Sequence, residues 1–229
     1  MKYYTVIWDF DGTILPTDPY DSEQSLLRHL LENAEGNISS LKRIVAKIAI
    51  LADRKEWIGQ AFKKYYVWIL KGTPAAALDR VSHQLAVKIS PSDRKALRYL
   101  HEAGHRLLLI SCGTLDLSER ILRHAGLDDI FDSIYGNRFQ WHQDRIVGMD
   151  LQLLGPDDKL NAVVQTGITP ATAIAVGDGY TDLPLLDWAD FPILLDRSGL
   201  KQKKLRHKNY RFVSSIHEVV EMIKKKLDT

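Results

Sequence analysis

Two carboxylates, Asp9 and Asp11, stand directly behind the apolar run Val6-Ile7-Trp8 and in front of Gly12-Thr13. A strand that ends in two acids and then breaks at a glycine presents both side chains at the edge of a sheet. One carboxylate there can attack an electrophile, the other can move protons, and the pair can hold a divalent cation. This motif predicts a catalytic centre if further polar residues reach the same edge.

Such residues occur later in the chain, each near an apolar segment. Ser111 follows the run Leu107 to Ile110, and Asp178 and Asp182 follow the run Ala171 to Val176. Lys159 lies between them, near the start of an expected helix. Since ligands bind outside the carboxyl ends of the strands in open α/β sheets, the spacing predicts one shared site.

The elements that must position these residues alternate between strand and helix from residue 88 onward, which is typical of a parallel sheet. We expect a Rossmann-like α/β fold with helices on both faces, formed by residues 1–16 and 88–229. Strands are expected at Lys2–Trp8, Arg106–Ile110, Ala171–Val176, Phe191–Leu195 and Tyr210–Val213, with a hairpin over Phe139–Leu153.

Residues 17–87 show helical patterns, which predicts an inserted cap domain of four helices. The second helix carries Leu41, Ile44, Val45, Ile48 and Leu51, and its segment Ile44–Ala52 is expected to face the core. The third is expected over Glu56–Leu70, and Thr73-Pro74 opens the fourth.

Length, net charge, cysteine content and the length of the apolar runs limit which class of protein this can be. The chain has 229 residues, a formal net charge of +2 and one cysteine, Cys112. No internal disulfide can form, no signal peptide is evident, and no apolar run reaches the ~18 residues of a membrane span. We expect a cytoplasmic protein, monomeric or homodimeric, without a membrane partner.

The basic run Lys201–Lys208 lacks aromatic residues, so a solvated loop is expected there rather than a nucleic-acid site.

Taken together, the motifs resemble the aspartate-nucleophile phosphatases of the haloacid dehalogenase superfamily. The first motif is Asp9 to Thr13, the second is Ser111, the third is Lys159, and the fourth runs from Gly177 to Asp182. The resemblance implies a Mg²⁺-dependent phosphatase with an aspartyl-phosphate intermediate on Asp9. Asp11 favours phosphate-ester chemistry, because it supplies the proton that a leaving alcohol needs.

The resemblance also implies the remaining roles. The Mg²⁺ ligands would be the side chains of Asp9 and Asp178 and the backbone carbonyl of Asp11. Ser111 and the Cys112 N–H would bind phosphate oxygens, Lys159 would neutralise charge, and Asp182 would orient Lys159 or a metal-bound water. The motif neighbours Gly12, Thr13 and Thr181 would support this set.

The helical cap and the fourth motif are similar to the phosphoserine phosphatase-like branch. Two positions depart from it. Asp18 stands where those enzymes carry a glutamate for the substrate amine, and Tyr66 falls near their carboxylate-binding arginine. Both are candidate specificity residues, and the expected partner is a small phosphorylated metabolite of unspecified identity. A phosphomutase or phosphotransferase with the same intermediate is an alternative, and a non-catalytic or RNA-binding protein on this fold is a more distant one.

Overall fold

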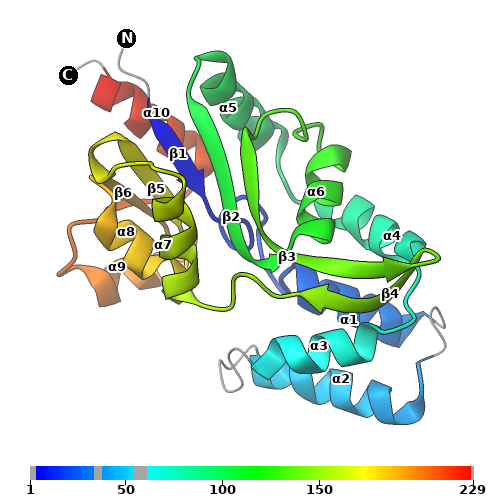
Figure 1. The fold of residues 1–229 in the computed structure, drawn as a ribbon. Coiled ribbons are helices and arrows are strands. Elements are labelled where there is room, and N and C mark those ends of the chain that lie inside the picture. Colours follow the sequence, from blue (N-terminus) through cyan, green and yellow to red (C-terminus); the bar gives the residue numbers. More distant parts are fainter. Residues whose placement is uncertain (1–3, 34–37, 54–60, 228–229) are drawn as a thin grey trace.

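A seven-stranded sheet in the order β4-β3-β2-β1-β5-β6-β7 forms the centre of the protein (Figure 1). The computed structural model describes residues 4–33, 38–53 and 61–227. Neighbouring strands are parallel except for β3 and β4, which form an antiparallel hairpin. The strands are β1 (Thr5–Trp8), β2 (Arg106–Thr114), β3 (Ser133–His142), β4 (Arg145–Asp150), β5 (Ala173–Gly177), β6 (Phe191–Leu195) and β7 (Arg211–Val213).

Ten α-helices and two short 3₁₀ turns connect these strands within the described residues. The helices are α1 (Ser22–Glu32), α2 (Ser40–Asp53), α3 (Ala61–Leu70), α4 (Ala75–Ala86), α5 (Pro91–Glu102), α6 (Leu115–His124), α7 (Pro156–Gln165), α8 (Leu183–Trp188), α9 (Leu200–Leu205) and α10 (Ile216–Leu227). The turns are η1 (Pro170–Thr172) and η2 (Tyr180–Asp182).

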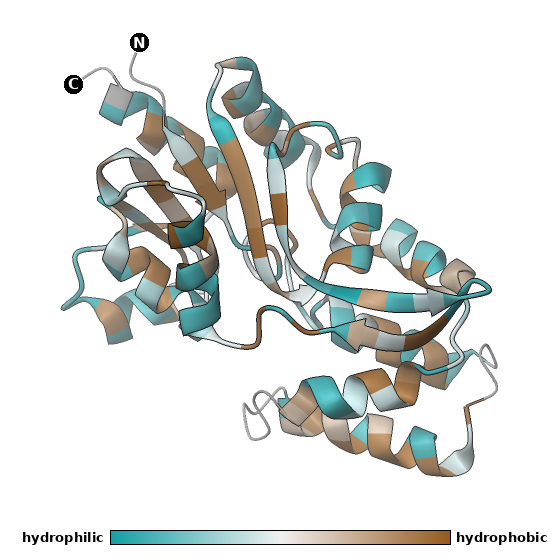
Figure 2. Cartoon of the chain, viewed as in Figure 1, coloured by the Kyte–Doolittle hydropathy of each residue, from teal (hydrophilic) through white to brown (hydrophobic). Residues whose placement is uncertain are grey.

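The central strands are apolar on both faces, as parallel strands covered by helices must be (Figure 2). In β1, Val6 and Trp8 face one core cluster, which α5, α6 and α10 cover, while Ile7 faces the other, which α7 and α8 cover. The expected α/β fold with helices on both faces is therefore confirmed. Of the expected first strand, residues 2 and 3 lie outside the described part.

Two strands are longer than predicted. β2 continues from Ile110 through Ser111 to Thr114, and β3 begins at Ser133, six residues before the expected hairpin. The missed part of β3 is only half-buried at its start, so it lacks the continuous apolar run that marks the other strands.

Among the described residues between β1 and α5 there are four helices, α1 to α4, as predicted. The third was expected to begin at Glu56, and residues 54–60 lie outside the described part. Helix α4 packs against α6 of the core and against α1, whereas α2 and α3 pack chiefly against one another. The β3–β4 hairpin reaches toward this pair, and Gly72 N–H donates to the carbonyl of Ile146 over 2.8 Å.

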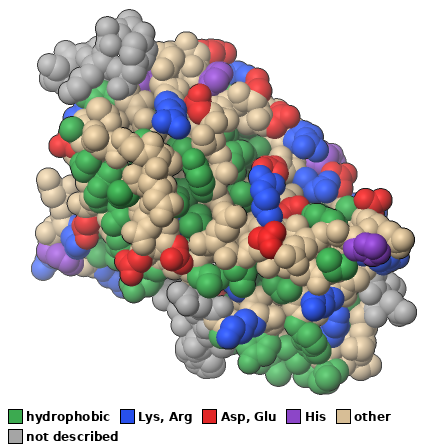
Figure 3. Space-filling view, in the orientation of Figure 1, with side chains coloured by type: hydrophobic (Ala, Val, Ile, Leu, Met, Phe, Trp, Pro, Cys, Tyr) green, Lys and Arg blue, Asp and Glu red, His purple; other side chains and the backbone are tan. Residues whose placement is uncertain are grey.

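The prediction for α2 is wrong in its orientation. Ala46, Ala49 and Ile50 are buried, whereas the larger residues of the helix are the exposed ones. The side chains of Leu41, Ile44, Ile48 and Leu51 are 57–62% exposed. They contribute to a hydrophobic patch at the lower end of the molecule (Figure 3). Because α2 carries apolar residues around most of its circumference, periodicity alone does not select its buried face.

Candidate active site

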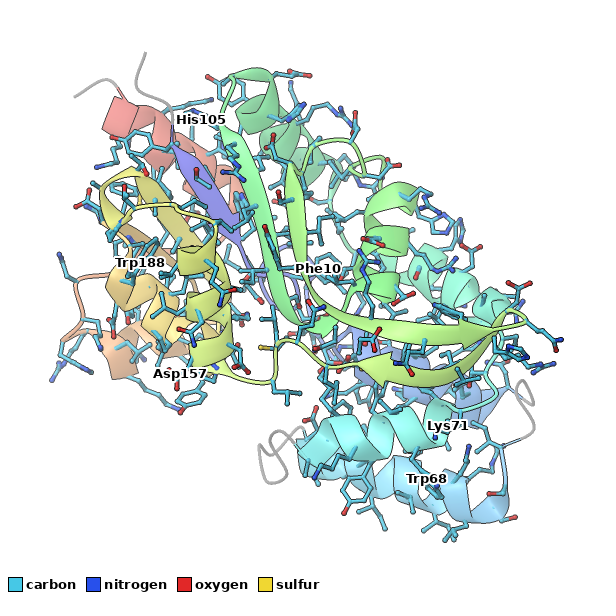
Figure 4. All side chains as sticks on the ribbon, viewed as in Figure 1. Phe10, Trp68, Lys71, His105, Asp157 and Trp188 are labelled. Atoms are coloured by element: carbon cyan, nitrogen blue, oxygen red, sulfur yellow. The ribbon has the colours of Figure 1, made fainter. Side chains whose placement is uncertain are left out.

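The strand order brings three of the predicted motifs together. β1 lies between β2 and β5, and Trp8 at its end is in register with Leu109 and Val176. Asp9 therefore emerges beside the C-terminal part of β2, which contains Ser111, and beside the end of β5, which Asp178 follows. Phe10, between the two motif acids, is fully buried and anchors the loop in the core (Figure 4).

Lys159 completes this arrangement from α7. Its Nζ lies 2.5 Å from Oδ1 of Asp9 and 2.7 Å from Oδ1 of Asp182, and its side chain is 1% exposed. Burial alone lowers the pKa of Lys159, but the Asp182 and Asp9 carboxylates outweigh burial and raise it. The ammonium group is therefore a fixed positive charge next to the predicted nucleophile.

Asp9 is held from two sides. Lys159 contacts one of its oxygens, and Thr13 Oγ1 donates to the other over 3.3 Å. Burial, followed by the neighbouring Asp182 carboxylate, raises the pKa of Asp9, and Lys159 opposes this effect. A cation bound at this place would favour the ionised carboxylate further.

Asp11 accepts hydrogen bonds from Ser22, the first residue of α1. The N–H and Oγ–H of Ser22 each donate to one Asp11 carboxylate oxygen, both over 2.8 Å. Enclosure of the carboxylate outweighs these bonds and raises the pKa of Asp11 to about 6. A carboxyl group with this pKa can both donate and accept a proton near neutral pH. Ser22 was not among the predicted site residues, so its contact with Asp11 is new.

The loop after β5 is organised by Asp182. Its Oδ2 accepts hydrogen bonds from the N–H groups of Asp178 (3.0 Å) and Gly179 (2.9 Å). Carboxylate oxygens of Asp9, Asp178 and Asp182 lie within 4.8 Å of one another. Gly12, with φ +87°, makes room for this cluster, because a Cβ there would overlap the Asp178 carboxylate. An all-oxygen donor set of this kind suits Mg²⁺, so the residues fit the expected metal.

Residues near α9 also support the motif loops. Lys201 Nζ lies 2.5 Å from both the carbonyl oxygen and Oδ2 of Asp178. Arg197 donates to the carbonyl of Thr13 over 2.8 Å. The expected solvated loop over Lys201–Lys208 is thus corrected: its first part is helical, and the Lys201 ammonium contacts Asp178 while its side chain stays 36% exposed.

The Ser111 loop is fixed by Asn137, which the sequence had not singled out. The fully buried Asn137 amide donates to the carbonyls of Cys112 and Leu153, each over 2.8 Å. Gly113 N–H donates to Ser111 Oγ over 2.9 Å. Burial raises the pKa of the Cys112 thiol to about 11, so the thiol is protonated near neutral pH. This agrees with a role for the Cys112 backbone rather than its sulfur.

A pocket of about 460 Å³ lies between the core and the helical insertion. Its core side is lined by Asp9, Asp11, Ser111, Cys112, Gly113, Leu154, Gly155, Pro156, Lys159, Asp178, Tyr180 and Thr181. Its opposite wall is formed by Asp21, Glu23, Asp53, Phe62 and Lys63, which we call the roof. Most of the predicted motif residues therefore line one cavity, whereas Gly12, Thr13 and Asp182 do not line it.

Comparison with known proteins supports this picture. The family model for haloacid dehalogenase-like hydrolases matches residues 6–187, which span all four motifs. The chain belongs to this family. A phosphoserine phosphatase of Archaeoglobus fulgidus is 28% identical over 200 residues, covering 85% of this chain and 50% of the relative. The chain thus spans half of that relative's length.

Two further comparisons extend over nearly the whole chain. A phosphoglycolate phosphatase of Cereibacter sphaeroides is 23% identical and covers 93% of this chain and 94% of its own. The solved structure of a phospho-aspartyl intermediate analogue of phosphoserine phosphatase superposes with a TM-score of 0.66 at 17% identity. It covers 97% of this chain and 99% of its own. This haloacid dehalogenase-like hydrolase therefore resembles the phosphoserine phosphatase-like branch.

The two predicted specificity residues of this hydrolase lie outside the set that lines the pocket. Asp18 is exposed on the segment before α1. Tyr66 is fully buried and stacks between Phe62 and Phe139, at ring distances of 5.5 and 6.0 Å. Tyr66 thus packs behind the roof residue Phe62. Within the described residues, no helix is both long and apolar enough to cross a bilayer.

Proposed function

We propose that the protein is a Mg²⁺-dependent phosphatase that hydrolyses a small phosphomonoester through an aspartyl-phosphate on Asp9. The observation that carries this proposal is that two acids at the base of one pocket lie in different environments. Asp9 is paired with a buried cation, Lys159, whereas Asp11 is hydrogen-bonded to Ser22 and has its pKa raised to about 6. These environments suit a nucleophile and a general acid, respectively.

In the first step, an Asp9 oxygen attacks phosphorus, the bond between phosphorus and the leaving oxygen breaks, and Asp11 gives its proton to that oxygen. In the second step, Asp11 takes a proton from water as the water oxygen attacks phosphorus. Inorganic phosphate leaves and the Asp9 carboxylate is restored. Lys159, Ser111 and the Cys112 N–H stabilise the negative charge on the phosphoryl oxygens.

Asp9, Asp178 and the backbone carbonyl of Asp11 are the proposed Mg²⁺ ligands. When bound, the ion would offset repulsion between the Asp9 carboxylate and the phosphate dianion. Asp182 is proposed to position Lys159, which it contacts directly. Gly12 gives the Asp178 carboxylate its space, while Thr13 and Thr181 support the site from the first and fourth motifs.

The four helices of residues 17–87 are proposed to act as a cap over the core formed by residues 1–16 and 88–229. The roof residues of the pocket all come from this insertion, and so does Ser22, which contacts Asp11. Residues of the cap would therefore face the leaving group, whereas core residues would face the phosphoryl group.

The test is phosphate release from p-nitrophenyl phosphate by the wild type and by Asp9→Asn, each with Mg²⁺ and with EDTA. We expect Mg²⁺-dependent turnover in the wild type and a loss of at least about 10³-fold in Asp9→Asn. Acid-quenched wild type should carry one phosphoryl group by mass spectrometry, and the variant none. Asp128→Asn, the same change at an exposed position, is the control. Full activity of Asp9→Asn would overturn the mechanism.

A further inference from the structure

The stretch Ser111–Gly113 departs from the regular pairing of the sheet. Ile110 and Thr114, four positions apart on β2, pair with residues that are only two positions apart on β3. Extra residues in one strand of a pair form a bulge, which redirects the backbone and side chains of that strand. The bulge carries both groups of β2 that are proposed to bind phosphate, Ser111 and the Cys112 N–H.

The side chain of Asn137, on β3, supplies hydrogen bonds to the backbone of this bulge. Carbonyl groups that a bulge turns away from the sheet need another partner, because an unpaired carbonyl in the interior is costly. Asn137 Nδ2 donates to the carbonyl of Cys112 over 2.8 Å and to that of Gly113 over 3.4 Å. Asn137 is fully buried and lies outside the set of residues that line the pocket, so it holds the bulge from behind.

The same amide binds a second segment of the chain, which follows β4. Asn137 Nδ2 donates to the carbonyl of Leu153 over 2.8 Å. Its Oδ1 accepts from the N–H groups of Gln152 and Leu153, over 2.8 and 3.0 Å. A primary amide offers two N–H donors and an oxygen with two lone pairs, so these contacts use its full capacity. The reversed amide would set its N–H groups against two backbone N–H groups, so the network admits one orientation.

This second segment leads directly to Lys159. It continues through Leu154 and Gly155, which line the pocket, into α7. The N–H groups of Leu154 and Gly155 donate to Oδ2 of Asp158 over 2.8 and 3.0 Å, which joins the segment to the first turn of α7. Since Lys159 follows Asp158 in that turn, Asn137 connects the bulge to the helix that carries the cation of the site.

We propose that Asn137 is a positioning residue for phosphoryl transfer, because its amide fixes the bulge that carries the phosphate-binding groups relative to Lys159. This inference rests on the proposed function. Donors that are already in place stabilise the charge on the phosphoryl oxygens without rearrangement, and a small misplacement of such groups slows a reaction strongly. The side chains proposed as Mg²⁺ ligands instead follow β1 and β5, which β2 separates from β3. Loss of the amide should therefore affect phosphate binding more than Mg²⁺ binding.

The experiment compares Asn137→Asp and Asn137→Ser with the wild type in p-nitrophenyl phosphate hydrolysis. Aspartate keeps the shape and the acceptor oxygen of the side chain, and serine leaves room for a water molecule in its place. We expect kcat/KM to fall, and the inhibition constant of inorganic phosphate to rise, by about tenfold or more in both variants. The Mg²⁺ concentration for half-maximal activation should change by less than about threefold, because its ligands lie on other strands.

Asp132→Ala is the control for a purely structural effect. Asp132 Oδ2 accepts from the N–H of Leu107 over 2.8 Å, at the opposite end of the same pair of strands. This variant should lose stability and keep the kinetic constants of the wild type.

Inhibition by phosphate at the wild-type level, in Asn137 variants that circular dichroism shows to be folded, would overturn the inference alone. Failure of both variants to fold would also count against it, because the amide would then be required for the fold itself. A wild type without p-nitrophenyl phosphate hydrolysis would instead overturn the proposed function, and the inference with it.

Discussion

The ammonium of Lys159 lies 2.5 Å from Oδ1 of Asp9, although 150 positions separate the two residues in the chain. The contact is buried and is shared with Asp182. It joins the first and fourth motifs through one cation, so its removal affects both folding and chemistry.

Lys159→Met should destabilise the protein, because it leaves two buried carboxylates without their partner. We expect the free energy of unfolding to fall by about 3–5 kcal/mol in urea titration. Turnover should fall at least about 10²-fold. The double variant Lys159→Met/Asp182→Asn should regain part of the stability but none of the activity. A single variant as stable as the wild type would contradict the structural role of the pair.

Asp11→Asn should affect substrates according to their leaving groups. An alkoxide leaves slowly without a proton, so hydrolysis of an alkyl phosphate should fall by about 10²–10⁴-fold. The p-nitrophenolate ion leaves without protonation, so the loss with p-nitrophenyl phosphate should be at least tenfold smaller. Equal losses with both substrates, measured as kcat/KM, would argue against Asp11 as the general acid.

The pH dependence of kcat/KM should reflect the raised pKa of Asp11, which is about 6. The first step needs protonated Asp11, so the rate should decline about tenfold per pH unit well above this pKa. Phosphomonoesters themselves titrate near pH 6, so Asp11→Asn serves as the reference profile. The limb that disappears in this variant belongs to Asp11, and identical profiles for both proteins would contradict this assignment.

Gly12→Ala should strain the backbone at residue 12 and should also displace the Asp178 carboxylate. Gly12 and Gly199 both have positive φ, +87° and +70°. A Cβ at Gly199 meets nothing within 4 Å, whereas at Gly12 it overlaps the Asp178 carboxylate. Gly199→Ala should cost about 1–2 kcal/mol of stability and leave activity intact. Gly12→Ala should cost more and weaken Mg²⁺ activation at least tenfold, as measured by Mg²⁺ titration of turnover. Equal behaviour of the two variants would show that the overlap is unimportant.

His105, which lies far from the site, should make the free energy of unfolding depend on pH. It is buried beside the start of β1, and Tyr4 N–H approaches its Nδ1 at 3.5 Å (Figure 4). Burial lowers the pKa of His105. The unfolded chain therefore binds the proton first, at about pH 6.5, and stability falls as the pH drops below that value.

His105→Asn keeps an acceptor but cannot titrate, so its free energy of unfolding should vary less between pH 7 and pH 5. The same substitution at the exposed His142 is the control. A steeper dependence in His105→Asn than in the wild type would contradict this prediction.

The residues at the strand ends could be predicted because each follows an apolar run that marks a parallel strand. Topology then requires Asp9, Ser111 and Asp178 to meet at one edge. The partners Ser22, Asn137 and Lys201 follow no such rule. Their contacts depend on how helices and the hairpin pack on the sheet, which residue type and spacing do not encode.

The roof of the pocket is a second example of contacts that could not be predicted from the sequence. Glu23 and Lys63 stand 40 positions apart on two helices, and each alone resembles an ordinary surface charge. Asp18, by contrast, stands at the position that corresponds to the glutamate of the phosphoserine phosphatase-like branch. The turn at residues 16–21 places Asp21 rather than Asp18 at the pocket, because position along the chain does not determine which side chain a turn directs inward.

The hairpin of β3 and β4 gives the helical insertion one anchored end. Gly72 N–H and the carbonyl of Thr73 pair with Ile146, Ala75 N–H pairs with the carbonyl of Asp144, and Arg145 donates to the carbonyl of Gly72. These bonds extend the sheet's own pattern into the turn between α3 and α4. The pair of helices α2 and α3 is therefore fixed to the hairpin at this turn, and these bonds do not hold its other end. Displacement of the pair would be smallest at this turn and largest at the last residue of α2 and the first turn of α3, where Asp53 and Phe62 line the pocket.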